Sequence, residues 1–365
     1  MLLKREEQAV FALRELYEGH GYRPYKMSQF EEYDLYVRNK EFLSSGQVIT
    51  FPARDGRLLA LKPDVTLSIV KNAPEKPGMV EKLYYNESVY RSDSATGDIR
   101  ELTQAGLECV GDLQPYDVSE VVLLAVKSLS LLGKTCILDI SHVGLLQAVL
   151  SQLPAGIREA AGQCLQQKNP HELKLVCDQC DEITVQKLSA LIEFAGCAEE
   201  VLPKLRSVMD KPEEQAALSE LSQVLTILSN RGLGTYVRVD FSLGGSMAYY
   251  NGLVFRGYLP GIPEAVLSGG QYDRLPSGMG KRSRAIGFAV YMDLLERLEE
   301  AGDAFDVDAV LICKAGEDPV KVDQVANSLS AKGSLLVCMQ IPDGCRPRRV
   351  YEFLDGEAKA QNGNG

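Results

Sequence analysis

The sequence lacks the features of membrane, secreted and broadly nucleic-acid-binding proteins. No apolar run approaches the roughly 18 residues of a membrane-spanning helix. Near the amino terminus, Val10, Leu13 and Leu16 recur at helical spacing among charges, unlike the unbroken apolar stretch of a signal peptide. The 39 basic residues are outnumbered by 50 acidic ones, giving a net charge of −11. This balance opposes a broad nucleic-acid footprint, although a local basic groove stays open.

The sequence also lacks a disulfide framework and a complete set of metal ligands. Its nine cysteines are scattered, which predicts a reducing, cytoplasmic location. The compact motif Cys177-Asp178-Gln179-Cys180 has no second ligand pair at matching spacing, and His171 lies six residues upstream. A redox pair would be expected to open a helix after a strand. We therefore expect two ordinary cysteines, with redox or metal use as the alternative, and no metal or cofactor.

The chain of 365 residues is longer than one usual domain. We expect a large core at 1–303 and a small α/β fragment at 304–365 that ends in a disordered tail. Residues of about 144–231 read as an almost wholly helical insertion with strand-like segments on both sides. These strands must pair across the insertion, which predicts an α+β fold with a mainly antiparallel sheet. The expected strands are 79–93, 99–112, 135–143, 235–243, 253–259, 266–273 and the first part of 285–302, a segment that is expected to run from a strand into a helix.

Several local signals mark turns and helix ends. Asp55-Gly56, flanked by alternating residues, is the strongest hairpin signal. A helix is predicted between Ser119, as its amino-terminal cap, and Gly133. Residues 306–341 predict a short strand–helix–strand piece.

Candidate binding residues occur on the strands at 79–93 and 99–112. Gln104 and Glu108 lie four apart, so the period of two places them on one side with Gly106 between them. Such a face is a poor core and suits either the floor of a polar pocket, with room for a ligand at the glycine, or a solvated edge. Arg91 and Arg100 flank the connecting loop, where they could grip a carboxylate or phosphate or remain surface charge.

Two other segments add candidates. Asp64 and Thr66 place a carboxylate and a hydroxyl near a helix start, either as a clamp for an amino group or as a cap. The stretch "DFSLGGSMAYYNGLVFRGYLPG", residues 240–261, combines a glycine pair, a tyrosine pair and a strand-like run, as a ligand pocket does. Its glycine pair can also serve a bulge or tight turn. After that pair, Arg256 is its one strongly charged residue.

Four separated blocks resemble the histidyl branch of the class II aminoacyl-tRNA synthetases. They are "LALKPDVT" at 59–66, "VYRSDSATGDIRELTQAGLECVG" at 89–111, "SMAYYNGLVFRGY" at 246–258 and "LSGGQYDRL…AIGFAV" at 267–290. The resemblance implies a class II synthetase-like antiparallel sheet with flanking helices and a histidine-like pocket. The pocket residues are expected to be Asp64, Thr66, Arg91, Gln104, Glu108, Tyr249 and Tyr250. Asp64 stands where the synthetases have a glutamate, which is one methylene longer.

Two arginines that histidyl-tRNA synthetases use for adenylation are missing from the matching positions. One position, four residues before Tyr249, is Gly245, and the other is Leu294. Glu296-Arg297 is a possible shifted match, but a slip of three residues points to another face of a helix. Losing one such donor typically costs about 10²- to 10³-fold in rate. The resemblance therefore implies a chain that does not catalyse adenylation.

A histidyl-synthetase-like core without these arginines resembles the regulatory subunits of ATP phosphoribosyltransferase. A complete anticodon-binding domain is also not expected, because only the short piece after residue 303 follows the core. This resemblance implies a non-catalytic protein of histidine biosynthesis that activates a short-form catalytic subunit and helps confer feedback inhibition by histidine. Its expected partners are that subunit, a second copy of itself and free histidine. The alternatives are an active histidyl-tRNA synthetase and a synthetase-like module that binds another target.

Overall fold

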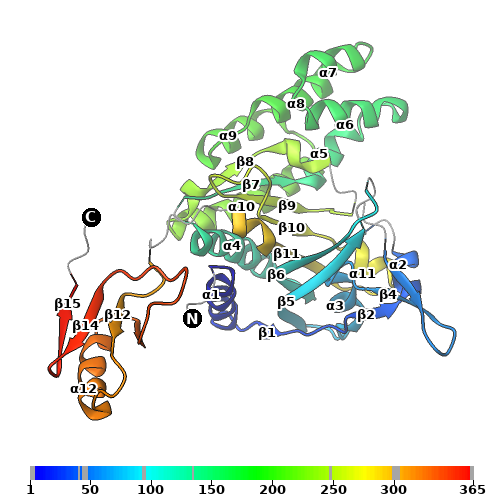
Figure 1. Cartoon of the computed structure of the whole chain (residues 1–365). Helices are drawn as coiled ribbons and strands as arrows, with labels where there is room; N and C mark the ends of the chain where they lie inside the picture. Colours follow the sequence, from blue (N-terminus) through cyan, green and yellow to red (C-terminus); the bar gives the residue numbers. More distant parts are fainter. Residues whose placement is uncertain are drawn as a thin grey trace. The chain divides into compact units, whose positions relative to one another are not determined.

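The computed structural model describes residues 5–39, 42, 48–92, 96–133, 135–245, 249–297 and 305–361. The chain divides at Arg297 into two compact units (Figure 1), the larger of which is Glu6–Arg297. The boundary expected at residue 303 stays a prediction, because it falls in a segment outside the described residues.

An eight-stranded sheet forms the centre of the larger unit, with the order β1-β5-β6-β11-β10-β9-β7-β8. The only parallel neighbours among these described strands are β1 with β5 and β7 with β8. The mainly antiparallel α+β plan is therefore confirmed. The strands are β1 (Arg23–Pro24), β5 (Val80–Ser92), β6 (Ile99–Gly111), β7 (Ile137–His142), β8 (Val237–Val239), β9 (Leu253–Tyr258), β10 (Leu267–Gln271) and β11 (Arg284–Tyr291).

Helices fill the interval between β7 and β8, and the strands on either side of it pair as expected. Strand β7 lies antiparallel to β9, and β6 lies antiparallel to β11. Figure 1 shows α6 to α9 gathered beyond the β7–β8 end of the sheet. The helices of this interval are α5 (Val143–Leu150), α6 (Arg158–Gln166), α7 (Pro170–Val176), α8 (Glu182–Glu193), α9 (Ala198–Val208) and α10 (Pro212–Asn230).

The two faces of the sheet carry different elements. Helix α4 (Pro115–Leu132) packs closely on one face, where a Cβ at Gly257 would overlap the side chain of Leu129. Helix α1 (Arg5–Glu18) joins α4 through a hydrogen bond of 3.0 Å between the hydroxyls of Tyr17 and Ser128. Elsewhere in the unit lie β2 (Phe30–Glu32), α2 (Tyr33–Arg38), β3 (Thr50–Pro52), β4 (Leu58–Leu61), α3 (Thr66–Asn72) and α11 (Arg274–Gly278).

Most helices, strands and turns lie close to the residues predicted for them from the sequence, and three segments differ. The Asp55-Gly56 hairpin is present, since β3 and β4 pair antiparallel and Gly56 has φ of 84°. Helix α4 starts at Pro115, and Ser119 is not its cap but donates to the Pro115 carbonyl. The strand expected at 235–243 is limited to β8, with a 3₁₀ turn, η3 (Phe241–Gly245), after it, and another turn, η4 (Met292–Arg297), follows β11 where a helix was expected.

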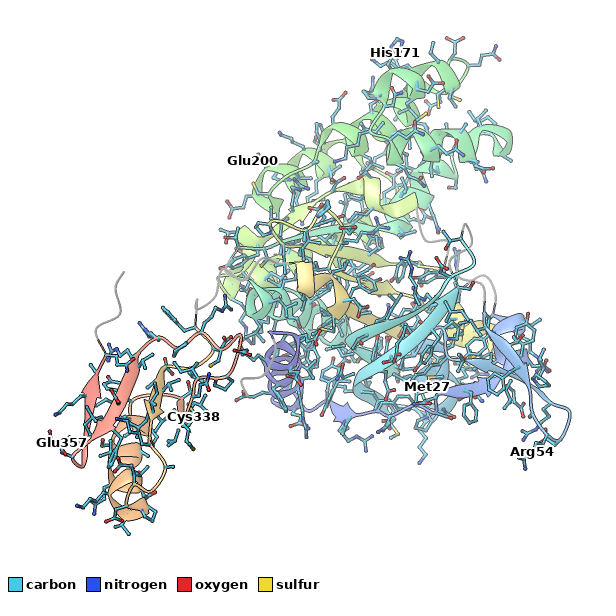
Figure 2. All side chains as sticks on the ribbon, in the orientation of Figure 1. Met27, Arg54, His171, Glu200, Cys338 and Glu357 are labelled. Atoms are coloured by element: carbon cyan, nitrogen blue, oxygen red, sulfur yellow. The ribbon has the colours of Figure 1, made fainter. Side chains whose placement is uncertain are left out.

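The smaller unit contains more strand structure than the sequence predicted. Its sheet has the order β13-β12-β14-β15, and Leu311, Cys313 and Phe353 form its buried core. Residues 357–360, assigned to a disordered tail, form a strand that follows a tight turn at Asp355 and Gly356. Both turn residues have positive φ, 55° and 85°. The elements are β12 (Ala309–Ile312), α12 (Pro319–Ser330), β13 (Leu335–Cys338), β14 (Val350–Leu354) and β15 (Glu357–Ala360), and Figure 2 labels Cys338 and Glu357 on this unit.

A buried ion pair joins two helices of the insertion. Lys187 of α8 is 1% exposed, and its Nζ lies 2.9 Å from both carboxylate oxygens of Glu214, which is 0% exposed. Asp210 also contacts this ammonium group, and the Gln152 amide donates to Glu214 at 2.7 Å. Removing one partner from such a pair leaves a buried charge without compensation.

We expect K187M to lower the free energy of unfolding by about 3–5 kcal/mol, because it leaves the Glu214 carboxylate buried without its cation. K174M, an equivalent change at an exposed lysine of α7, is the control and should change stability by less than about 0.5 kcal/mol. Urea unfolding monitored by circular dichroism measures both variants. Equal stabilities of K187M and K174M would show that the pair contributes nothing.

Candidate functional site

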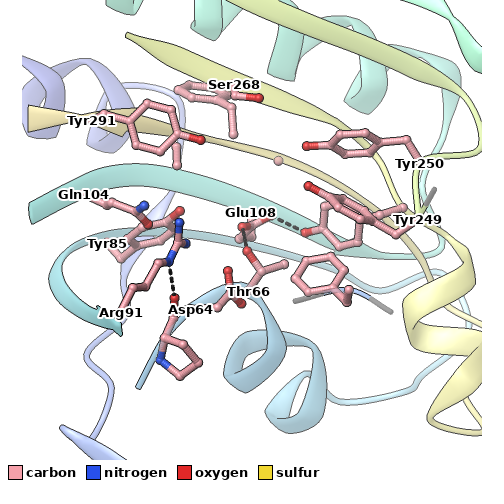
Figure 3. A pocket seen from close by; sticks show the side chains of 16 residues that line it. Asp64, Thr66, Tyr85, Arg91, Gln104, Glu108, Tyr249, Tyr250, Ser268 and Tyr291 are labelled. Carbon is pink, nitrogen blue, oxygen red and sulfur yellow. Dashed lines mark hydrogen bonds between the residues drawn. The ribbon is translucent and has the colours of Figure 1, made fainter. Parts of the chain in front are cut away.

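A polar cavity lies on the sheet face opposite α4, between the sheet and the start of α3. Its volume is about 90 Å³, several times the space that one water molecule needs. The cavity can therefore hold a small polar molecule, unlike a filled core. It is lined by Phe42, Pro63, Asp64, Thr66, Tyr85, Arg91, Gln104, Glu108, Tyr249, Tyr250, Ser268, Tyr272, Gly287, Phe288, Ala289 and Tyr291 (Figure 3).

All seven residues predicted to bind a ligand line this one cavity, although they come from five places in the chain. The loop after β4 supplies Asp64, and α3 begins at Thr66. Arg91 projects from β5, and the period of two brings Gln104 and Glu108 of β6 to the same side, as predicted. The tyrosine pair stands just before β9, with the rings of Tyr249 and Tyr250 4.3 Å apart.

Glu108 lies at the buried end of the cavity and is 2% exposed. The Thr66 hydroxyl donates to its Oε1 at 2.6 Å, and the Tyr272 hydroxyl donates to its Oε2. Burial raises the pKa of Glu108 to about 8, with a smaller contribution from the neighbouring Asp64 carboxylate. The empty cavity thus favours a protonated Glu108 at neutral pH.

Glycines shape the cavity floor. Gly287 of β11 pairs directly with Glu108, and a Cβ at this glycine would overlap the Glu108 carboxyl group. A Cβ at Gly106 would overlap the hydroxyl of Tyr85 from the neighbouring strand. The space at Gly106 was expected to hold a ligand, but it is filled by Tyr85, so this glycine shapes the site indirectly.

Asp64 combines the two roles that the sequence left open. Its Oδ1 accepts a hydrogen bond of 2.9 Å from the Leu67 backbone N–H and so caps the first turn of α3. The same carboxyl group faces the cavity, where burial raises its pKa and the nearby Arg91 partly offsets that rise. Thr66 serves the pocket through its hydrogen bond to Glu108.

Arg91 is the one cationic residue among the described residues that line the cavity. Its Nε donates to the Pro63 carbonyl oxygen at 3.0 Å, which fixes the guanidinium group beside Asp64. Arg100 lies opposite Arg91 in the antiparallel pairing of β5 and β6. It is exposed and does not line the cavity. Of the two arginines that the sequence proposed for binding a carboxylate or phosphate, only Arg91 is placed in the cavity.

The sequence did not single out several aromatic and hydroxyl side chains of the site. They are Tyr85, Ser268, Tyr272 and Tyr291, together with Phe42, whose ring lies 4.5 Å from that of Tyr249. Tyr272 had a local signal, because Ser268, Gly270 and Tyr272 alternate along one face of a predicted strand. Tyr85 shares a face of its predicted strand with Arg91 by the period of two, but its place over Gly106 depends on pairing with the next strand.

The positions that lack the synthetase arginines contribute no charge to the cavity. Gly245 ends η3, and Leu294, which lies in η4, is not among the described residues that line the site. The side chains of Glu296 and Arg297, the shifted match, lie outside the described part of the structure. Within the described lining, one arginine faces two acidic residues, which is a poor environment for the phosphates of ATP.

Neither a metal site nor a membrane-spanning helix is found among the described residues. They contain no group of three or more candidate metal ligands, and none of the described helices is long and apolar enough to cross a membrane. Cys177 directly follows α7 as its carboxyl-terminal cap, and the Cys180 N–H donates to the Cys177 carbonyl at 2.9 Å in a simple turn. The interpretation of two ordinary cysteines stays a prediction.

The chain is similar to known proteins over most of its length. Residues 2–295 match the family model described as histidyl-tRNA synthetase. The ATP phosphoribosyltransferase regulatory subunit of Caldanaerobacter subterraneus subsp. tengcongensis is 30% identical over 337 residues, covering 88% of this chain and 87% of that protein. This chain belongs to the family of ATP phosphoribosyltransferase regulatory subunits.

Solved structures agree with this family in fold. A regulatory subunit/histidyl-tRNA synthetase from Bacillus halodurans superposes with a TM-score of 0.73 at 22% identity, over 93% of this chain and 90% of that one. A chain of the ATP phosphoribosyl transferase (HisG:HisZ) complex from Thermotoga maritima gives a TM-score of 0.63 at 21% identity, over 79% and 97%. The class II synthetase-like architecture is therefore confirmed.

Family membership also confirms the functional class that the sequence predicted. The chain is a regulatory subunit and not an enzyme in its own right. This agrees with a cavity that has one cation among its described lining residues.

We expect the stability of the regulatory subunit to depend on the protonation of Glu108. A carboxyl group with a raised folded-state pKa stabilises the fold fully below its unfolded pKa, and this contribution is lost as the pH rises through the folded value. Stability should therefore decrease between about pH 4.5 and pH 8, by at most about 1.4 kcal/mol per pH unit. E108Q removes the ionisable group and should lack this part of the decrease.

Urea unfolding of wild type and E108Q at four pH values between 5 and 9 measures the effect. The difference in unfolding free energy, wild type minus E108Q, should shrink as the pH rises. Parallel curves would mean that Glu108 is already ionised in the folded protein.

Proposed function

We propose that this regulatory subunit binds free histidine in the cavity around Glu108 and transmits that binding to a separate ATP phosphoribosyltransferase catalytic subunit. The observation that carries the proposal is the set of ionisable groups in the cavity, where a Glu108 that is protonated in the empty site can ionise beside a positive group of the ligand. Asp64 and Glu108 face a single cation, Arg91, among the described lining residues. A ligand with positive groups and one carboxylate complements this arrangement, and histidine has both.

The positions of the polar groups support this choice of ligand. Arg91 presents a guanidinium group that suits the ligand carboxylate. Asp64 and Gln104 can accept hydrogen bonds from an α-ammonium group, and Glu108 lies deepest, where an imidazole N–H would reach it. The tyrosine pair and Phe42 supply flat apolar walls for the ring.

The partner is proposed from the relatives. The Thermotoga maritima neighbour is part of a HisG:HisZ complex, and the family name describes a regulatory subunit. We infer that this chain forms a hetero-oligomer with the short-form catalytic subunit, which carries the catalytic residues. Pairing of the chain with a second copy of itself is the further expectation for a class II synthetase-like core.

Feedback inhibition then follows from linkage. Histidine shifts the catalytic subunit between active and inhibited arrangements only as far as it binds the two arrangements with different affinity. The coupling is reciprocal, so a substrate or assembly state that histidine weakens must weaken histidine binding by the same factor.

We expect D64N to raise the histidine concentration for half-inhibition of the reconstituted complex by about tenfold or more. The substitution keeps the acceptor for the Leu67 N–H but removes the charge, and a hydrogen bond to a charged group contributes about 1.5–3 kcal/mol. The assay is phosphoribosyl-ATP formation by the coexpressed subunits with histidine titrated in. E101Q, the same type of change at an exposed position of β6, is the control and should inhibit as wild type does.

Two results would contradict this proposal. Activity of the catalytic subunit that does not depend on this chain would remove the regulatory role. Unchanged half-inhibition in D64N would place histidine elsewhere in the complex.

The chain alone should give no histidine-dependent exchange of pyrophosphate into ATP, because adenylation needs several cations aimed at the phosphates and the described lining of this cavity holds only Arg91. A histidyl-tRNA synthetase run in parallel provides the positive control. Exchange above the no-enzyme background, or copurification with tRNA rather than with the catalytic subunit, would favour the alternative functions.

A further inference from the structure

A buried glutamine links the helical insertion to strand β10, which Tyr272 directly follows. Gln271 ends β10 and is 1% exposed. Its Oε1 accepts a hydrogen bond of 2.6 Å from the Leu253 N–H of β9, and its Nε2 donates to Glu220 Oε1 of α10 at 3.1 Å. The oxygen and the nitrogen of this buried amide therefore both have hydrogen-bond partners. One partner belongs to the sheet, and the other, Glu220, lies 51 residues earlier in the chain on a helix.

Glu220 is held in place by a second contact. His142 Nδ1 accepts a hydrogen bond of 3.2 Å from the Leu145 N–H at the start of α5, so the ring proton is left on Nε2. This Nε2 lies 3.2 Å from Glu220 Oε2 and donates to it. The bond to His142 is the main reason that the pKa of Glu220 lies below its usual value, and Gln271 adds to it.

The backbone around Gln271 is fitted to this bridge. A Cβ at Gly252 would overlap the Gln271 side chain, so a glycine is required beside it. Asn251 and Asp273 add a reciprocal pair, since Asn251 Nδ2 donates to Asp273 Oδ2 at 3.1 Å and the Asp273 N–H donates to Asn251 Oδ1 at 2.8 Å. Asn251, Leu253, Gln271 and Asp273 form what we call the β9–β10 clamp.

Neighbouring residues of a strand point to opposite sides of the sheet, and this places the clamp on the side of the sheet opposite the cavity. Gln271 points to the α10 side of the sheet, and the next residue, Tyr272, points to the cavity and donates to Glu108. Tyr250 likewise precedes a clamp residue and lines the cavity. A change in the position of α10 would therefore reach both tyrosines through a single strand pair.

We propose that Glu220 and Gln271 are positioning residues that couple helix α10 to the cavity by holding Tyr272 against Glu108. This inference rests on the proposed function, because histidine affinity is one of its readouts. It assigns to the insertion a role in regulation, in which any partner contact that moves α10 alters the ligand site.

Calorimetric titration of the full-length chain with histidine tests the coupling. E220A should weaken binding about tenfold, because it releases the Gln271 amide. E220Q keeps an acceptor oxygen for Gln271 and should stay within about threefold of wild type. E213A, at an exposed glutamate of the same helix, is the matched control and should bind as wild type does.

A double-mutant cycle distinguishes coupling from general destabilisation. If Glu220 acts through Tyr272, E220A should add little to the loss already caused by Y272F, so the double variant binds about as weakly as Y272F alone. Independent effects would instead multiply, to about a hundredfold if each single change costs tenfold. A multiplicative result would overturn the coupling.

Amide hydrogen exchange of the unliganded chain separates this inference from the choice of ligand. The Leu253 amide, which donates to Gln271, should exchange faster in E220A than in E213A. An unchanged rate at Leu253 overturns the clamp whether or not histidine binds. Faster exchange in a chain whose wild type binds no histidine would overturn the proposed ligand while supporting the clamp.

Discussion

The buried carboxyl group of Glu108 is the constraint on which the arrangement of the site depends. A carboxyl group away from water is tolerated when it is protonated or receives hydrogen bonds. The chain provides both conditions, with two hydroxyl donors and a pKa of about 8. Room for the group comes from Gly287 on the facing strand, and the neighbouring Asp64 makes its ionisation still less favourable. The cavity thus has one acidic group, Glu108, that no cation of the described lining neutralises, because Arg91 lies beside Asp64.

The same charge balance separates binding from catalysis. A synthetase site must stabilise the negative charge that develops on phosphates, which requires several cations aimed at them. Here the described lining holds a single arginine against two carboxyl groups. The fold therefore keeps a polar cavity without the several cations that adenylation needs, and in the proposed role the free energy of ligand binding would shift a partner between states. Membership in a family of regulatory subunits agrees with this division.

The sheet connects the parts of the larger unit because each strand has two faces. Strand β10 ends in Gln271 on the helix side, and Tyr272 follows on the cavity side. Helix α10 is anchored in the insertion by Glu214 and at the sheet by Glu220. Displacement at either end changes the position of buried polar groups, which are costly to leave without partners.

The sequence by itself determined features that depend on near neighbours in the chain. The period of two placed Gln104 and Glu108 on one face, and Asp55-Gly56 forms the predicted turn. Asp355-Gly356 carries the same local turn signal, although the polar residues after it predict a disordered tail. Only the tertiary structure decided which distant groups meet. Tyr272 reaches Glu108 across 164 residues, and Gln271 reaches Glu220 across 51. Such contacts depend on strand order and register across a helical insertion, and local propensity contains no information about either.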